Sequence, residues 1–131
     1  MEDTIITFEI AKLAKEKGFD GNCYAFYEKE FMRNDGKIIY TFGPQCNKNY
    51  LESEYKRHNN GKYLAPTQSL LAKWLREKCS LYVYPILQYP YYGYEIRKIQ
   101  DDDKLLKEEI QIGDNFEEAY EIGLQEVLKL I

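Results

Sequence analysis

The spacing of apolar residues along the chain predicts three amphipathic helices. The first covers residues 8–17 and follows Thr7, a good N-cap residue. The second begins after Thr67, and its apolar stripe is centred on Trp74, which we expect in the core. The third begins at Asn115 and runs towards the C-terminus, with acidic residues in its first turn. Each stripe is one-sided, so each helix must pack against a second layer.

Segments rich in β-branched and aromatic residues separate these helices. Residues 23–32 and 37–42 flank an Asp-Gly pair, which predicts an early β-hairpin. Three further strands are expected in the second half of the chain: residues 80–87, 92–99 and 105–112. The pattern therefore predicts an α+β fold. We expect an antiparallel β meander with helices packed mainly on one face, plus an N-terminal helix and β-hairpin.

Residues 43–66 have the least regular pattern. A short helix over about residues 50–58, capped by Asn49, is the economical interpretation. Lys56 and Arg57 would lie at its end, with Lys62 beyond. These cations suit either a solvated helix end or contacts to phosphate groups. No repeat, low-complexity tract or linker interrupts the chain, so residues 1–131 are predicted to form a single α+β domain.

The charges exclude some classes of partner. The chain has 18 basic and 22 acidic residues, a net charge of −4. Residues 101–131 hold ten acidic and three basic residues, a net of −7, which leaves +3 for residues 1–100. This polarity disfavours a duplex-DNA binder, which needs a basic surface. No apolar run reaches the ~18 residues of a membrane span, and the acidic N-terminus does not resemble a secretory signal. We therefore expect a cytoplasmic protein that does not bind membranes.

The residues of catalytic and metal sites are sparse. Cys23, Cys46 and Cys79 are far apart in sequence and lack C-x-x-C spacing, so we expect three scattered free thiols. His58 is the single histidine, and no phosphate-binding, nucleophile-elbow or metalloprotease motif is present. The acidic run at 101–103 suits a solvated turn better than a calcium loop. We expect no enzymatic activity, no metal and no cofactor.

Tyrosine is the unusual component. Six of the thirteen tyrosines lie between Tyr82 and Tyr94, within the predicted hairpin. Strand alternation puts Tyr82 and Tyr84 on one face, and Tyr92 and Tyr94 likewise share a face. Cross-strand pairing explains part of this excess, and a binding surface of rigid amphipathic rings is the alternative. The candidate binding residues are Tyr89, Tyr91, Tyr92, Tyr94, Arg97, Lys56, Arg57 and Lys62.

Three stretches carry a resemblance to known proteins. They are ITFEIAKLAKEKGFD at 6–20, APTQSLLAKWLREK at 65–78 and NFEEAYEIGLQEVLKLI at 115–131. In these stretches the chain resembles small uncharacterised proteins encoded by phages and prophages of gut Bacteroides-type bacteria. The resemblance covers most of the length, with 43–64 the least similar part. Such proteins often continue the second stretch with His-Asn, whereas this chain has Cys79-Ser80. The resemblance implies a phage origin and no particular chemistry.

Three functional hypotheses follow. The first is a non-enzymatic phage accessory protein, of counter-defence type, that binds a host or phage protein through the Tyr-rich hairpin and residues 43–64. The second is an oligomeric module that binds or sequesters a nucleotide signal, with a Tyr on the base and phosphates on Lys56, Arg57, Lys62 or Arg97. Self-association into a homo-oligomer would also suit exposed aromatic residues at a sheet edge. Single-stranded nucleic-acid binding is a third hypothesis, and it conflicts with the acidic C-terminal third.

Overall fold

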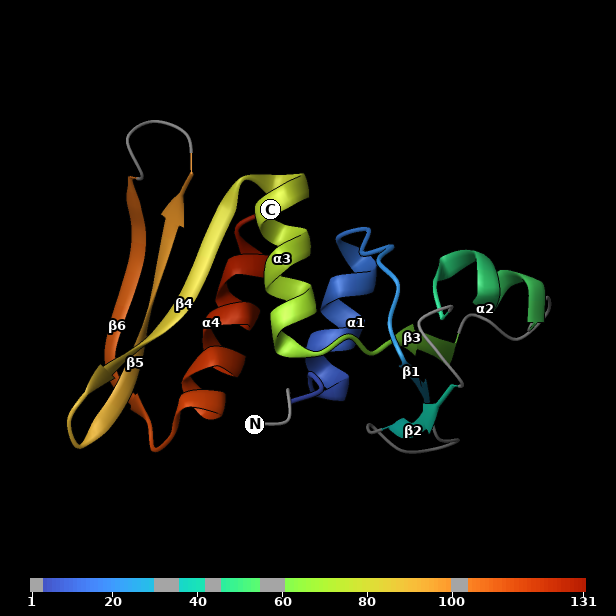
Figure 1. The fold of residues 1–131 in the computed structure, drawn as a ribbon, viewed down its shortest axis with the longest axis horizontal. Coiled ribbons are helices and arrows are strands. Elements are labelled where there is room, and N and C mark those ends of the chain that lie inside the picture. The colour runs from blue at the N-terminus through green and yellow to red at the C-terminus, as the bar shows by residue number, and fades with distance from the viewer. Residues whose placement is uncertain (1–3, 30–35, 42–45, 55–60, 100–103) are drawn as a thin grey trace. The chain divides into compact units, whose positions relative to one another are not determined.

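The structure, a computed structural model, describes residues 4–29, 36–41, 46–54, 61–99 and 104–131, without the side chains of 52–54. The chain divides into two compact units, Met1–Leu70 and Leu71–Ile131, and each is described by itself. The boundary falls within the first turn of helix α3 (Gln68–Cys79) (Figure 1). The single-domain interpretation stays a prediction.

The N-terminal unit combines two helices with a small antiparallel sheet. Its elements are α1 (Phe8–Glu16), β1 (Ala25–Lys29), β2 (Gly36–Tyr40), α2 (Lys48–Glu54) and β3 (Lys62–Leu64). The strand order is β2-β1-β3, with Tyr27 of β1 opposite Ile38 of β2 and Tyr63 of β3. The early hairpin is confirmed. Of its Asp-Gly pair, Gly36 begins β2 and Asp35 lies outside the described residues. β3 was not expected, because three residues are too few to show a periodic pattern.

Side-chain caps start the helices of this unit. Thr7 Oγ1 accepts a hydrogen bond from Ile10 N at 3.4 Å, as the sequence predicts for α1. Helix α2 begins two residues earlier than predicted, because Asn47 Oδ1 accepts from Tyr50 N at 2.9 Å. The prediction of Asn49 as the cap is therefore wrong.

The core of the N-terminal unit joins α1 to the sheet and to the segments around it. Its fully buried side chains include those of Ile6, Ile10, Ala14, Cys23, Ala25, Phe26 and Cys46. Tyr27 donates a 2.7 Å hydrogen bond from its hydroxyl group to Ile6 O, which ties β1 to the segment before α1. Ile6 N in turn donates to Pro66 O at 3.1 Å, so a backbone hydrogen bond joins the segment before α1 to the segment that follows β3.

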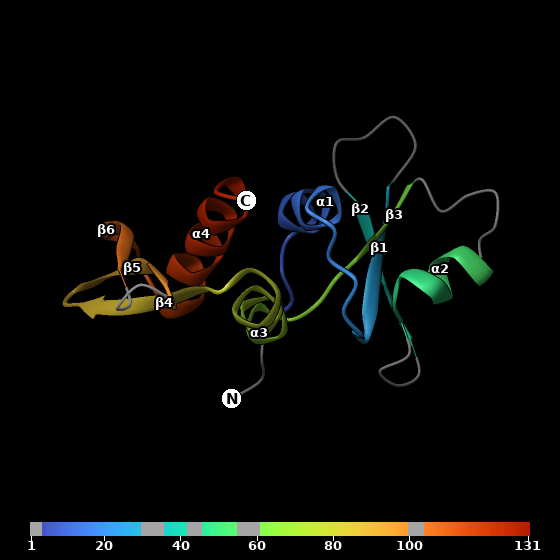
Figure 2. The ribbon, with the colours of Figure 1, turned by 90° about the horizontal axis from the view of Figure 1, so that it is seen from above.

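The C-terminal unit is the predicted meander covered by a helix. It contains β4 (Leu81–Gln88), β5 (Tyr91–Lys98), β6 (Leu105–Gly113) and α4 (Phe116–Lys129). The strands are antiparallel in the order β4-β5-β6, and α4 lies along one face of this sheet (Figures 1 and 2). The α+β fold, with its meander, N-terminal helix and hairpin, is thus confirmed.

Packing between α4 and the sheet forms the core of the C-terminal unit. Asn115 caps α4 by accepting from Glu118 N at 2.8 Å, as predicted. Gly123 sits so close to the sheet that an added Cβ atom would lie 3.0 Å from Val83 Cγ2 and 3.1 Å from Tyr94 Cγ. Trp74 of α3 is only half-buried, so its predicted role as a central core residue is wrong; the fully buried members of that stripe include Leu71 and Leu75.

Candidate functional site

Tyr82 and Tyr84 of β4 lie on the opposite face of the sheet from Tyr92 and Tyr94 of β5. Val83 is buried beneath α4, so its neighbours Tyr82 and Tyr84 point to the face that α4 does not cover. Their ring centroids are 5.0 Å apart in an edge-to-face arrangement. Tyr92 and Tyr94 share the α4 face, where the Tyr92 ring lies 6.4 Å from that of Phe116. Both predictions of shared faces are confirmed.

Tyr94 belongs to the core rather than to a surface. Its side chain is fully buried under α4, and it faces Gly123. Burial raises the pKa of the Tyr94 phenol, because the charged phenolate loses its hydration there. Tyr94 was included among the candidate binding residues, and its burial removes it from any surface that a partner could contact.

Three large side chains are exposed at and beside the turn between β4 and β5. Leu87 is 61% exposed, Tyr89 is 89% exposed and Tyr91 is 43% exposed. Tyr89 is joined to Pro90 by a cis peptide bond at the turn. We call Leu87, Tyr89 and Tyr91 the hairpin tip. On most protein surfaces, large apolar or aromatic side chains are exposed one at a time. Here three of them lie within five residues around one turn.

A polar cluster occupies the middle of the uncovered sheet face. The Tyr84 hydroxyl group donates to Glu95 Oε2, and Arg97 Nε donates to the same carboxylate oxygen at 3.1 Å and to Tyr84 Oη at 3.3 Å. The hydrogen bond from Tyr84 lowers the pKa of Glu95 and raises that of Tyr84, since it stabilises the carboxylate and the neutral phenol together. Arg97 therefore hydrogen-bonds to Tyr84 and Glu95 on the sheet surface and is not a freely solvated cation.

Tyr82 continues this face towards α3. The Arg76 guanidinium carbon lies 5.7 Å from the centroid of the Tyr82 ring, within the range of a cation–π contact. The uncovered face thus presents the rings of Tyr82 and Tyr84, the second with its hydroxyl group engaged. By the register of the hairpin, Tyr91 continues this face towards the turn, whereas Leu87 alternates onto the α4 face.

Strand β6 is poorly suited to pair with another strand. Its pairing with β5 shifts register twice, and Gln111 has a positive φ of 54°. Near this irregularity the chain passes so close to β5 that a Cβ atom on Gly93 would lie 2.2 Å from Glu109 O. Only glycine permits that approach. Bulged and charged edges of this kind discourage strand addition, so edge-to-edge pairing through β6 is disfavoured.

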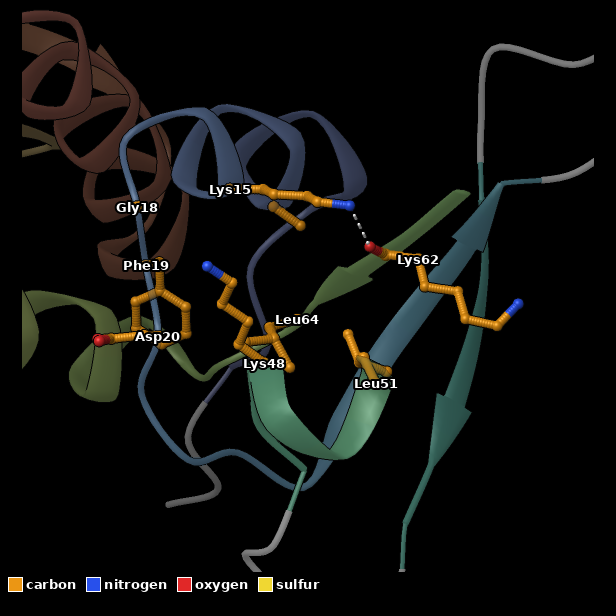
Figure 3. Close-up of a pocket in the computed structure, with 9 residues that line it drawn as sticks. Lys15, Gly18, Phe19, Asp20, Lys48, Leu51, Lys62 and Leu64 are labelled. Atoms are coloured by element: carbon orange, nitrogen blue, oxygen red, sulfur yellow. Dashed lines mark hydrogen bonds between the residues drawn. The ribbon is translucent and has the colours of Figure 1, made fainter. Parts of the chain in front are cut away.

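The predicted basic residues do not form one group. Lys56 and Arg57 lie outside the described residues. Lys62 belongs to β3, is buried, and its Nζ forms an ion pair with Glu28 Oε1 at 3.5 Å. Lys62 is also among the residues that line a cavity of about 260 Å³ in the N-terminal unit, a site that the sequence did not indicate (Figure 3).

Two of the cysteines meet, against the expectation of three scattered thiols. Cys23 and Cys46 are both fully buried and face each other across an isolated antiparallel bridge, with Cys23 N donating to Cys46 O at 2.8 Å. Their thiols share Ala25 O as a hydrogen-bond acceptor, at 3.4 and 3.7 Å. The thiols are free, and a hydrogen bond with the Cys23 thiol, together with burial, raises the pKa of Cys46. Within the described ranges no group of three or more His, Cys, Asp or Glu residues could hold a metal ion.

Comparison with protein-family models, curated proteins and solved structures finds no match to this chain. In the part of the chain that the structure describes, no helix has the length and apolarity needed to cross a membrane.

Proposed function

We propose that this chain acts without catalysis, by binding another protein through the hairpin tip and the adjoining uncovered face of the β4–β5–β6 sheet. The observation that carries the proposal is the exposure of Leu87, Tyr89 and Tyr91, which lie within five residues at and beside one turn. Tyrosine supplies a large contact area with only two side-chain torsions to fix, so it contributes affinity at low entropic cost. Interfaces are enriched in such rings at their energetic centres.

The support beneath the hairpin tip favours a preformed surface. β4 and β5 pair over their full length, from Leu81 opposite Lys98 to Gln88 opposite Tyr91. The Gln88 side chain also accepts a hydrogen bond from Gln111 N at 3.1 Å, which ties the end of the hairpin to β6. A rigid support reduces the conformational entropy that binding would otherwise cost.

The partner that we propose is a different protein rather than a second copy of this chain. Self-association through the edges of this sheet would use β4 or β6. The edge of β6 is bulged and charged, and β4 contains Pro85, which has no backbone N–H to donate, so both edges disfavour strand addition. The resemblance to phage-encoded proteins makes a host protein the natural target, with counter-defence as the biological role. These assignments rest on the sequence resemblance alone.

A photo-crosslinking experiment tests where the partner binds. Tyr89 is replaced by the photoreactive residue benzoylphenylalanine, and the chain is irradiated in host cells. Tyr40, 67% exposed on β2, is replaced in the same way as the control position. We expect a single dominant adduct of the chain with another protein from position 89 and none from position 40. Adducts with a second copy of the chain, equal adducts from both positions, or no adduct would overturn the proposal.

A further inference from the structure

The buried Cys23–Cys46 pair has no part in the proposed protein interface. Both cysteines belong to the N-terminal unit, whereas the hairpin tip belongs to the C-terminal unit. Cys23 lies two residues before β1 and Cys46 two residues before α2, so the pair joins the segments that lead into these two elements. Two thiols held together in this way can act as a redox site if a bond between their sulfur atoms fits the backbone.

The backbone around the pair suits a disulfide bond. Cys23 and Cys46 are opposite each other in an isolated antiparallel bridge, and Cys23 N donates to Cys46 O at 2.8 Å. Facing residues of an antiparallel pair have Cα atoms about 4.5–5.5 Å apart, within the range of about 4.4–6.8 Å that disulfides span. The neighbouring side chains join the same two segments, because Asn47 Nδ2 donates to Asn22 Oδ1 at 2.8 Å. A bond between the sulfur atoms therefore needs no large movement of the backbone.

The two cysteine side chains also point towards each other. Cys23 Sγ donates to Ala25 O at 3.4 Å, and Cys46 Sγ lies 3.7 Å from the same oxygen atom. The two thiols also hydrogen-bond to each other. Both are free and fully buried. They are therefore a pair in direct contact rather than two separate apolar side chains of the core.

This contact makes the two thiols chemically unequal. A hydrogen bond with the Cys46 thiol lowers the pKa of Cys23, because it stabilises the Cys23 thiolate, and burial opposes this effect. The same hydrogen bond and burial both raise the pKa of Cys46. Because the thiolate is the reactive form of a cysteine, Cys23 is the nucleophile of the pair and Cys46 is the thiol that keeps its proton.

We propose that Cys23 and Cys46 form a reversible disulfide when hydrogen peroxide oxidises the chain. The Cys23 thiolate attacks one peroxide oxygen atom, the O–O bond breaks, and the leaving hydroxide takes up a proton to become water. Cys46 then attacks the sulfur atom of the Cys23 sulfenic acid, the S–O bond breaks and a second water molecule leaves. Two electrons pass from the thiols to the peroxide, and an external dithiol returns them by thiol–disulfide exchange.

Burial sets the rate of this reaction. Peroxide reaches the two thiols when the segments around them open locally, and an isolated bridge opens more readily than a strand within a sheet. We therefore expect oxidation over minutes to hours, slower than that of an exposed thiol.

The disulfide should stabilise the N-terminal unit. It closes a loop that contains the β1–β2 hairpin, and a cross-link stabilises a fold mainly by restricting the unfolded chain. For a loop of this length the melting temperature should rise by about 10 °C. In a reducing compartment the pair stays as thiols, so this gain is confined to oxidising conditions.

Mass spectrometry of the full chain tests the disulfide. Cys79→Ser removes the third, partly exposed thiol, and this variant is incubated with millimolar hydrogen peroxide under native conditions. We expect the mass to fall by about 2 Da, the mass of two hydrogen atoms, and digestion to release two peptides linked through Cys23 and Cys46. Dithiothreitol should restore the original mass and remove the rise in melting temperature. The same linked peptides are sought in the unaltered chain.

A chain with a single thiol is the matched control. Cys46→Ala, combined with Cys79→Ser, leaves Cys23 without its partner. Peroxide should produce no loss of two hydrogen atoms in this control and no rise in its melting temperature.

Several outcomes would overturn the proposal. They are the absence of linked peptides from the folded chain, linkage in urea alone, oxygen addition at either cysteine in place of linkage, and a linked chain that melts below the reduced one. None of these results bears on the hairpin tip, so failure here leaves the proposed protein interface standing.

Discussion

Individual tyrosines in this chain differ in what their hydroxyl groups contact. The Tyr27 hydroxyl group donates to a backbone carbonyl, and that of Tyr84 donates to Glu95. Tyr94 Oη is buried, and among the described residues it meets no hydrogen-bond partner. A buried hydroxyl group without a partner costs stability, whereas one with a partner contributes it. The same residue type therefore has opposite energetic roles at positions 84 and 94.

Removing these two hydroxyl groups should change stability in opposite directions. Tyr94→Phe should raise the free energy of unfolding by about 1 kcal/mol, because the desolvated hydroxyl group is lost and the ring is kept. Tyr84→Phe should lower it by about 1 kcal/mol, because Glu95 loses a donor. Urea unfolding of both variants measures the two changes. Destabilisation by Tyr94→Phe would show that its hydroxyl group is satisfied.

The three cysteines should react at different rates. Cys23 and Cys46 are fully buried, whereas Cys79 is partly exposed at the end of α3. Because a thiol reagent needs access to the thiolate, we expect one of the three thiols to react quickly in the folded chain and all three in urea. Cys79→Ser should abolish the fast reaction. Rapid modification of two or three thiols in the folded chain would contradict the buried Cys23–Cys46 pair.

At the level of elements, local signals explain most helix starts and fail where a contact is non-local. Thr7 and Asn115 cap as predicted, since a side chain three residues before an amide needs no tertiary information. Asn47 and Asn49 are both possible caps in the sequence. Asn47 is also held from outside the helix, because its Nδ2 donates to Asn22 Oδ1 at 2.8 Å. That partner is 25 residues away, and the sequence pattern cannot reveal it.

Helix α4 should tolerate no larger residue at position 123. Gly123→Val should lower the free energy of unfolding by about 1–3 kcal/mol, because Val83 and Tyr94 leave no room for the side chain. Gln125→Val introduces the same residue two positions along the same helix, at a half-buried site, and should cost much less. Thermal unfolding followed by circular dichroism compares the two. Equal effects would mean that α4 does not pack closely on the sheet at Gly123.

For the whole molecule, the sequence predicted the fold class better than it predicted the sites. Two β-prone runs with Pro90 between them located the turn of the hairpin, where Tyr89 lies and from which Tyr91 begins β5. Strand alternation could not distinguish buried Tyr94 from exposed neighbours, since that depends on how α4 crosses the sheet. The Cys23–Cys46 pair and the lysines of the cavity were missed for the same reason, because each depends on segments distant in sequence.

Acid should destabilise the chain through two carboxylates. Hydrogen bonds from Tyr84 and Lys107 lower the pKa values of Glu95 and Glu126, respectively. A lowered pKa in the folded state adds stability above the ordinary glutamate value of about 4.3, and this stability is lost as pH falls through the folded-state value. We therefore expect the free energy of unfolding to fall from pH 6 to about pH 3.

Neutral variants test the origin of this acid sensitivity. Glu95→Gln and Glu126→Gln together should reduce the difference in unfolding free energy between pH 6 and about pH 3. Glu16→Gln, an exposed residue of α1, should leave that difference nearly as it is. An unchanged acid response in the double variant would mean that other carboxylates control it.

The affinity of the partner protein for a chain altered at the hairpin tip tests the proposed function most directly. The partner recovered by crosslinking is purified, and its dissociation constant is measured by calorimetry. The test variant carries Leu87→Ser, Tyr89→Ser and Tyr91→Ser, and the control carries Tyr24→Ser and Tyr40→Ser at exposed tyrosines of the other unit. Loss of interface hot spots costs about 2 kcal/mol or more, so the tip variant should bind at least about 30-fold more weakly while the control binds normally. Equal affinity of the tip variant and the original chain would contradict the proposed interface.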